Sequence, residues 1–126
     1  MLDTHALLWY DRDPQRLPLR ASALIRAAGN EVYISAVSAW ELGIKFHAGK
    51  LPSAGPLVQG FHAVLAAYNF IELPLTVLHA LQAAGFAQTH KDPFDRALAA
   101  QSLLEQLTLV SADAALDAFG VARIWD

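Results

Sequence analysis

Four short apolar runs rich in strand-forming residues, separated by segments of helical periodicity, constrain the fold of this chain more than any other feature. They are VYIS at 32–35, FIEL at 70–73, LTLVS at 107–111 and ARIW at 122–125. Strands that alternate with helices pair in parallel, because each crossover returns the chain to the same edge of the sheet. The sequence therefore predicts an α/β protein with a parallel sheet.

Apolar periodicity, capping residues and glycine stops mark the intervening segments as helices. The expected helices span residues 4–9, 19–28, 38–49, 56–68, 76–85, 93–106 and 114–118. Thr76 is expected to cap the helix 76–85, and Gly120 to end the last helix. No repeat or linker interrupts the 126 residues, so one domain is expected over residues 1–126.

Two features of the composition narrow the metal chemistry and the location. The chain has no cysteine, which excludes a disulfide framework and leaves oxygen or imidazole ligands for any metal. Its apolar stretches are shorter than a membrane span, and its N-terminus lacks the basic and apolar regions of a signal peptide. We expect a soluble cytoplasmic protein without a membrane partner.

The charge balance does not by itself predict a nucleic-acid-binding protein. Lys plus Arg total 9 and Asp plus Glu total 12, which gives a net charge of −3. A nucleic-acid partner would need a local basic patch. Four arginines share one segment, where their positions are typical of a solvated face: Arg12, Arg16, Arg20 and Arg26. The apolar fraction of 55% indicates that some apolar surface contacts a partner.

Carboxylates stand at two junctions between a predicted strand and the helix after it. Asp3 follows the short apolar start Met1-Leu2 and precedes a helix, and Asp113 lies two residues beyond the run 107–111. In an open parallel sheet such junctions line the carboxyl edge of the strands, where ligands bind. The two acids are therefore expected to converge.

Three more carboxylates are expected near this edge. Glu41 lies about one turn into the helix that follows the run 32–35, and Asp92 and Asp95 open the helix 93–106. A spacing of three places these two aspartates near one face of the first turn. Five carboxylates from four segments are thus expected around one cleft.

Each carboxylate alone has a structural interpretation, as a helix N-cap, a partner of the helix dipole or, for Glu41, an i,i+4 partner of Lys45. Together, however, carboxylates in a partly dehydrated cleft raise one another's pKa and destabilise the fold unless a cation neutralises them. Oxygen ligands favour Mg²⁺ or Mn²⁺, and such an ion activates water for attack on a phosphodiester. The set therefore predicts metal-dependent phosphodiester hydrolysis.

Four motifs follow one another over nearly the whole chain. They are LDTHALLW at the start, SAVSAWELGIK in the middle, HKDPFDRALAAQS, and LVSADAAL near the end. Any one of them is weakly specific, but the ordered set resembles the PIN-domain ribonucleases, and specifically the VapC-type toxins of type II toxin–antitoxin modules, in the subgroup that contains DPFDR.

The resemblance implies a PIN-like three-layer α/β/α sandwich whose central parallel sheet has about five strands. It implies that Asp3, Glu41, Asp95 and Asp113 form an acidic quartet that binds Mg²⁺ or Mn²⁺, with Asp92 as an additional metal ligand or a residue behind the ligands. It further implies an endoribonuclease that cleaves RNA with metal-activated water, forms a homodimer and is neutralised by a cognate VapB-type antitoxin.

The start of the chain departs from the family pattern. Members of the family have several apolar residues before the first aspartate, whereas only Met1 and Leu2 precede Asp3 here. A central strand this short is expected to leave ladder groups on its neighbours unpaired.

Residues beside the acids have both functional and structural interpretations. The hydroxyls of Thr4 and Ser111 suit the orientation of Asp3 or of a metal-bound water, and equally suit capping. His5 and His90 suit a general base or a hydrogen bond to an acid or a phosphate.

Two cations and several apolar residues complete the candidates. Lys45 and Arg96 suit screening of the acidic cluster or contact with a scissile phosphate. The apolar residues of 5–10 and 37–48 are candidates for the groove that binds an antitoxin segment. The aromatic side chains suit the core, with base stacking as the alternative.

Two alternatives from other classes stay open. One is a phosphoacceptor domain similar to response-regulator receivers, which needs a lysine after a late strand that LVSADAAL does not supply. The other is a non-catalytic cation-binding interaction domain of PIN-like fold.

Overall fold

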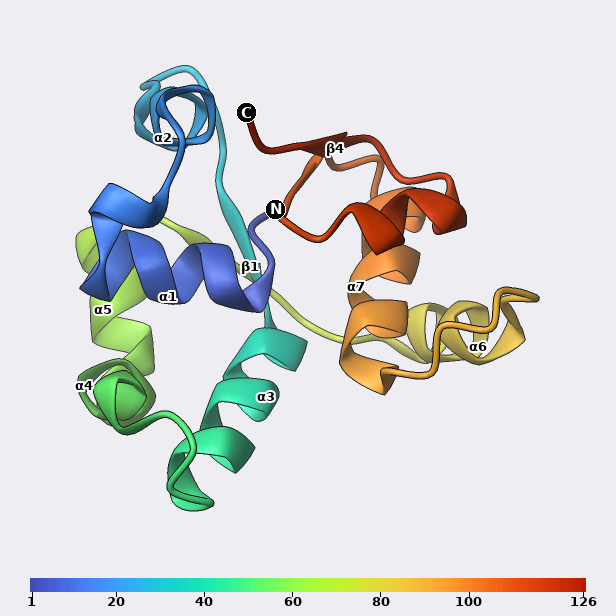
Figure 1. Cartoon of the computed structure of the whole chain (residues 1–126), viewed down its shortest axis with the longest axis horizontal. Coiled ribbons are helices and arrows are strands. Elements are labelled where there is room, and N and C mark those ends of the chain that lie inside the picture. Colours follow the sequence, from blue (N-terminus) through green and yellow to red (C-terminus); the bar gives the residue numbers. More distant parts are fainter.

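The computed structural model describes all 126 residues, as helices arranged around short parallel strands (Figure 1). The α-helices are α1 (Thr4–Arg12), α2 (Leu19–Arg26), α3 (Ala36–His47), α4 (Gly55–Gln59), α5 (Phe61–Ala67), α6 (Val77–Gly85) and α7 (Pro93–Leu104). The strands are β1 (Tyr33–Ser35), β2 (Ile71–Leu73), β3 (Leu109–Val110) and β4 (Arg123–Ile124). Three 3₁₀ turns are η1 (Pro14–Arg16), η2 (Pro52–Ala54) and η3 (Ala114–Phe119).

All strand pairing is parallel, which confirms the predicted mixed α/β class. β1 pairs with β2 and β3 pairs with β4, each pair forming a two-stranded sheet. Leu2 lies between the two sheets and forms isolated parallel bridges to Ile34 of β1 and Val110 of β3. Five segments therefore lie side by side, but the segment in the middle contributes a bridge residue in place of a full strand.

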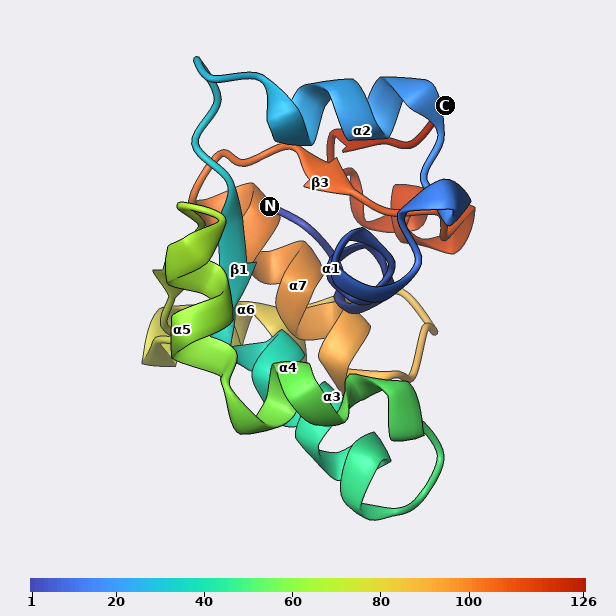
Figure 2. The same cartoon turned by 90° about the vertical axis from the view of Figure 1, so that its left-hand side faces the viewer.

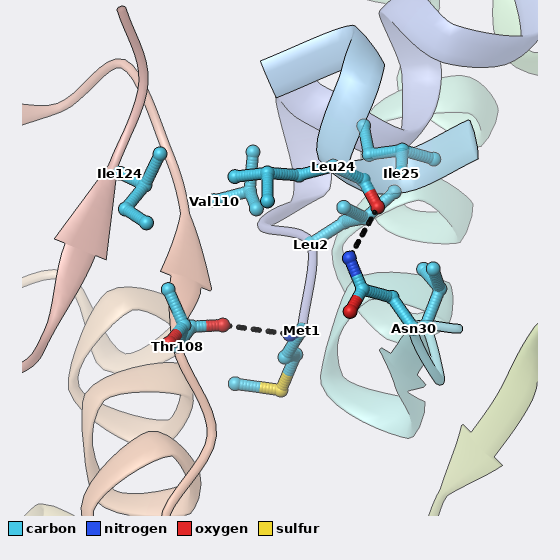
Figure 3. A pocket seen from close by; sticks show the side chains of 9 residues that line it. Met1, Leu2, Leu24, Ile25, Asn30, Thr108, Val110 and Ile124 are labelled. Atoms are coloured by element: carbon cyan, nitrogen blue, oxygen red, sulfur yellow. Dashed lines mark hydrogen bonds between the residues drawn. The ribbon is translucent and has the colours of Figure 1, made fainter. Parts of the chain in front are cut away.

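The short N-terminal segment pairs with the strands on both sides of it. The Leu2 amide donates to the Tyr33 carbonyl at 3.1 Å, and the Asp3 amide donates to the Val110 carbonyl at 3.0 Å. The terminal ammonium of Met1 donates to the Thr108 carbonyl at 2.7 Å, beside an apolar cavity of about 180 Å³ (Figure 3). At the level of Leu2, the strands on both sides are therefore hydrogen-bonded to the N-terminal segment, contrary to the expectation of unpaired groups. The apolar cavity lies at the amino end of this segment, beside Met1.

Two apolar cores lie on opposite sides of the strands, since side chains alternate between faces along an extended segment. Leu2 and Val110 belong to one core, which α1, α2, α4 and α5 cover. Met1 and Leu109 belong to the other, which α7 and η3 cover. Figures 1 and 2 show these two groups of helices on the two sides of the strands. β1 and β3, which flank Leu2, are largely buried, whereas β2 and β4 at the two edges are more exposed.

Several predicted boundaries are wrong, and local geometry explains why. The helix expected from Ser38 begins at Ala36, because the Ser35 hydroxyl accepts the Val37 amide and acts as the N-cap. The helix expected over 56–68 is two helices, α4 and α5, separated at Gly60, whose φ is −123°. Thr76 caps α6 as predicted, and Gly120 ends η3 with a φ of 80°. None of the helices has the length and apolar character needed to span a membrane.

Candidate metal centre

A cavity of about 110 Å³ at the carboxyl ends of the strands has no apolar residue in its lining. Its walls are formed by Asp3, Thr4, His5, Glu41, Lys45, Asp92, Asp95 and Asp113. The structure thus brings together all five carboxylates that the sequence singled out. They come from α1, α3, α7 and η3, whose N-terminal ends or first turns meet at this edge.

Helix capping positions three of the five acids. Asp3 accepts the Ala6 amide at 2.8 Å, Asp92 accepts the Phe94 amide at 2.9 Å, and Asp113 accepts the Ala115 amide at 3.0 Å. Each of these bonds uses an Oδ1 atom. The cap therefore fixes the orientation of each carboxylate, and its Oδ2 can serve a ligand.

Asp3 is the most deeply placed of these caps, with 9% of its surface exposed. Burial raises the pKa of Asp3, and the negative charge of Glu41 raises it further. Hydrogen bonds from Ser111 and the Ala6 amide, together with the charge of His5, oppose this rise. A nearby cation would stabilise the ionised form of a carboxylate held in this way.

Asp95 lies in the first turn of α7 and contacts His90. The Nε2 atom of His90 and Oδ2 of Asp95 are 2.9 Å apart. Burial raises the pKa of Asp95, the charges of Asp92 and Glu41 add to the rise, and His90 opposes it. His90, Asp95 and Asp113 each offer one ligand atom, and these three atoms lie within 4.8 Å of one another. Imidazole nitrogen is thus available beside the oxygen donors.

Glu41 and Lys45 form the predicted i,i+4 ion pair, at 2.5 Å between Nζ and Oε2. Glu41 is buried and Lys45 is about one-third exposed. The ammonium group offsets one negative charge inside the cavity. Because Lys45 lines the same cavity, it is also placed to donate to an anionic substrate group.

Arg96 does not screen the acidic cluster. Its guanidinium donates to the Phe86 carbonyl at 2.8 Å and to the carbonyls of Ala83, Gln88 and His90 at 2.9 Å each. A longer bond of 3.5 Å reaches the Ala84 carbonyl. Arg96 therefore fastens the segment between α6 and α7, including the backbone of His90.

The hydroxyls beside the acids have structural partners. Thr4 donates to the Ser38 hydroxyl at 3.1 Å, and the Ser111 hydroxyl accepts the Asp113 amide at 3.0 Å. Thr4 links α1 to α3, and Ser111 shapes the turn that holds Asp113. Ser111 also hydrogen-bonds the Asp3 carboxylate and so contributes to its orientation, whereas the bond of Thr4 to Ser38 favours the structural interpretation of Thr4.

The role of His90 as a possible metal ligand was missed from the sequence, which suggested only a base or a hydrogen-bond partner. Its position five residues before Asp95 was the available signal. What the sequence lacks is the fold of residues 86–91, which returns His90 toward the cavity. That fold depends on carbonyl contacts with Arg96 that no local pattern encodes.

The donor set suits a hard divalent cation. Four carboxylates with a fifth close by supply the oxygen ligands that Mg²⁺ and Mn²⁺ prefer, and the chain has no thiolate to select a softer metal. Burial raises the pKa of both Asp3 and Asp95, and neighbouring carboxylates add to the rise, so the ionised form of each is disfavoured in the metal-free cavity. A bound cation would stabilise that ionised form.

Fold and site together define a parallel α/β protein with an acidic centre suited to a divalent metal. The chain belongs to the PIN domain family, whose model matches residues 1–121. PIN domains are generally metal-dependent nucleases. No curated protein and no solved structure matches the chain. Membership of this family does not support the alternative of a phosphoacceptor domain.

Proposed function

We propose that this protein is a Mg²⁺- or Mn²⁺-dependent endoribonuclease that hydrolyses phosphodiester bonds of RNA. The observation that carries the proposal is the convergence of five carboxylates from four elements on one wholly polar cavity. A purely structural use of these acids as caps would not require them to face one another. A cation between them would relieve their mutual repulsion.

In this proposal Asp3, Glu41, Asp95 and Asp113 hold the metal, with Asp92 beside them. The bound ion supplies an activated water and neutralises charge that develops on the phosphodiester. The Ala6 and Ala115 amides keep Asp3 and Asp113 oriented, and His90 orients Asp95. Lys45 pairs with Glu41 and lines the same cavity, so its ammonium group could donate to a substrate phosphate oxygen when Glu41 holds the metal.

The finer assignment is a cytoplasmic VapC-type toxin, one domain over residues 1–126, with the three-layer sandwich and five-stranded sheet of that group. In this assignment the protein forms a homodimer, and its partner is a cognate VapB-type antitoxin. Of the two segments expected to bind the antitoxin, α3 carries the exposed apolar side chains, with Trp40 59% and Ile44 46% exposed. The aliphatic residues of α1 are buried in the core, so the antitoxin groove is centred on α3.

Cleavage of total RNA by the purified protein, with mapping of the cut ends, tests the proposal. We expect cleavage with Mn²⁺ or Mg²⁺ and none with EDTA. Asp95→Asn and Asp3→Asn should each reduce cleavage to background while the far-UV circular dichroism spectrum is unchanged, because asparagine retains the size of the side chain and the capping oxygen. Glu31→Gln, an exposed acid remote from the cavity, is the control. Full activity of both aspartate variants would refute the proposal.

A non-catalytic cation-binding domain of PIN-like fold is the second candidate, because the same five carboxylates could hold a cation whose role is structural. Calorimetric titration with Mn²⁺ beside the cleavage assay separates the two. Tight Mn²⁺ binding without cleavage of any RNA, in protein free of antitoxin, would support this second candidate.

A further inference from the structure

A second groove, of about 340 Å³, adjoins the acidic cavity and shares His5 with it. One helix forms a wall of both, since Thr4 and His5 of α1 lie at the acidic end and Leu8, Trp9 and Arg12 lie in the groove. Residues four apart in a helix lie on the same face, so α1 presents a continuous surface from the cavity into the groove. Asp13, the residue before η1, and Arg16 at the end of η1 also line it, and Leu51 and Ser53 close the other side.

The groove separates the four arginines of this segment into two pairs. Arg12 and Arg16 line it, whereas Arg20 and Arg26 do not. Arg20 donates to the Asp126 carbonyl at 3.1 Å, and Arg26 donates to the Ser22 hydroxyl at 3.0 Å. Only the first pair is therefore placed beside the acidic cavity.

The cations of the groove are only weakly neutralised. Arg16 is 3.8 Å from Asp13, with 59% of its side chain exposed. Arg12 is 3.3 Å from Asp11, with 40% of its side chain exposed. The long, exposed Arg16–Asp13 pair contributes little and exchanges readily for a stronger anion. Asp11, the partner of Arg12, is nearly buried and lies outside the lining, so the groove itself presents two guanidinium groups and the single carboxylate of Asp13.

An aromatic side chain supports one of these guanidinium groups. Arg16 lies over the ring of Trp9 at 4.7 Å from its centroid. The ring of Trp9 in turn lies 5.7 Å from that of His5, at the boundary with the acidic cavity. This cation–π contact holds the Arg16 guanidinium over the indole, and its N–H groups are suited to donate to a phosphate.

We propose that this groove binds the single-stranded RNA segment next to the scissile phosphate. The inference rests on the proposed function, since it gives the nuclease its substrate path. An acidic cavity repels the sugar–phosphate backbone, so a nearby cationic surface is needed to hold the strand over it. Arg12 and Arg16 contact backbone phosphates, and the Trp9–Arg16 pair provides a stacking platform.

Binding of a fluorescein-labelled oligoribonucleotide of ten nucleotides, measured by anisotropy over a salt series, tests the proposal. Asp95→Asn is used as the background so that the RNA is not cut. We expect Arg12→Gln/Arg16→Gln to weaken binding at least about 10-fold and to lower the slope of log K against log salt by about 1.4, that is, about 0.7 for each of two lost phosphate contacts. Arg20→Gln/Arg26→Gln removes the same charge from the same segment and should change binding less than about 2-fold.

Three results would overturn the inference. Equal weakening in the two double variants would mean that only net charge matters. Unchanged binding in Arg12→Gln/Arg16→Gln would place the RNA elsewhere. A ten-residue polyglutamate peptide that binds as tightly, with the same dependence on Arg12 and Arg16, would make the ligand an acidic peptide. Cleavage by the parent protein is measured separately. If the parent protein cleaves RNA while Arg12→Gln/Arg16→Gln leaves RNA binding unchanged, the RNA-binding role of the groove is disproved and the proposed function stands.

Discussion

At the scale of single residues, Asp3 combines two duties that oppose each other energetically. As the N-cap of α1 it satisfies the Ala6 amide, a contribution of about 1 kcal/mol to stability. As a buried acid it costs free energy when ionised, because burial raises its pKa above the ordinary value of 3.8. Ionised Asp3 therefore destabilises the metal-free fold.

Asp3→Asn should therefore stabilise the metal-free protein at neutral pH. An acid whose pKa is raised by folding adds no cost below the unfolded pKa of 3.8; the cost grows between pH 3.8 and the folded pKa and is complete above the folded pKa. Asparagine retains the cap and removes the charge. At pH 7 in EDTA we expect a gain on the order of 1 kcal/mol, or roughly 4 °C in Tm, that shrinks toward pH 4.

Thermal unfolding of the parent protein and the variant from pH 4 to pH 8 checks this prediction. Added Mn²⁺ provides the control, because it should raise the Tm of the parent protein and leave the variant nearly unchanged. A variant that is less stable than the parent protein at every pH would show that the cap depends on the charge of Asp3.

His90 is the second residue whose substitution is informative. It contacts Asp95 at 2.9 Å and offers its own nitrogen within the cluster with Asp113. Groups that orient or join metal ligands typically change affinity 10–100-fold when removed, so His90→Ala should weaken Mn²⁺ binding roughly 10-fold. Calorimetric titration measures this. His62→Ala, which breaks an exposed pair with Glu72, is the matched control and should bind Mn²⁺ as the parent protein does.

The carboxylates were predictable at this scale because each is tied to a local signal. Capping positions follow directly from helix starts, and helix starts at one edge of a parallel sheet converge by topology. Arg96 was not predictable, because its five acceptors lie on a segment before α7 whose path the sequence does not indicate. Every residue type has a backbone carbonyl, so no sequence pattern identifies the partners of a side chain that donates to carbonyls.

At the scale of elements, the connection between α6 and α7 has no secondary structure of its own and depends on Arg96. Three of the five carbonyls that accept from Arg96 belong to this connection: Phe86, Gln88 and His90. The other two are the carbonyls of Ala83 and Ala84 near the end of α6. One side chain therefore satisfies the end of one helix and fixes the approach to the next.

Arg96→Lys should loosen this connection. An ammonium group has three donors on a flexible stem and does not reproduce the planar set of contacts. Because hydrogen bonds from a charged donor are worth about 1.5–3 kcal/mol each and lysine recovers some of them, we expect a loss of about 2 kcal/mol in urea unfolding. Amide exchange should rise in residues 84–91 and stay unchanged in α1.

Arg20→Lys is the matched control for this change, since Arg20 is exposed and makes a single bond to the Asp126 carbonyl. It should alter the free energy of unfolding by less than about 0.5 kcal/mol. Equal stability of the Arg96 and Arg20 variants would mean that the carbonyl contacts of Arg96 add nothing to the free energy of unfolding.

Element types were predictable from the sequence, whereas their limits were less so. All four apolar runs contain a strand, but each strand is only two or three residues long, because pairing ends where the neighbouring segment leaves the ladder. The break at Gly60 was missed, since the apolar positions on either side continue a helical pattern. Tertiary packing sets the limits of helices and strands, and a local sequence pattern carries no information about that packing.

At the scale of the whole molecule, the order of motifs specified the family, and the parallel pairing followed from the alternation of elements. What the sequence did not predict is that Leu2 joins two sheets through single bridges. A segment of two apolar residues has no periodicity from which pairing could be read. Its place follows from the residues on either side, with Ile34 and Val110 each leaving a ladder position for it.

The outer surface of the molecule carries an apolar patch on α6 that the core does not use. Val77 is 76% exposed, Leu78 63% and Leu81 67%. Side chains this exposed on one helix are typical of a surface that contacts a partner. Since α3 is the surface proposed for the antitoxin, α6 is available for the proposed homodimer.

Leu78→Asp/Leu81→Asp should therefore convert a dimer to a monomer. Light scattering coupled to gel filtration should give twice the chain mass of 13.7 kDa for the parent protein and a single chain mass for the variant. The dimer should dissociate because a charge at the centre of an apolar interface is costly to desolvate. The fold of the single chain should be retained because both side chains are exposed to solvent in it. Leu19→Asp is the control, because Leu19 is 91% exposed on α2, away from the patch, and should leave the dimer intact. A parent protein that is monomeric at every concentration tested, or a variant that stays dimeric, would remove α6 as the dimer surface.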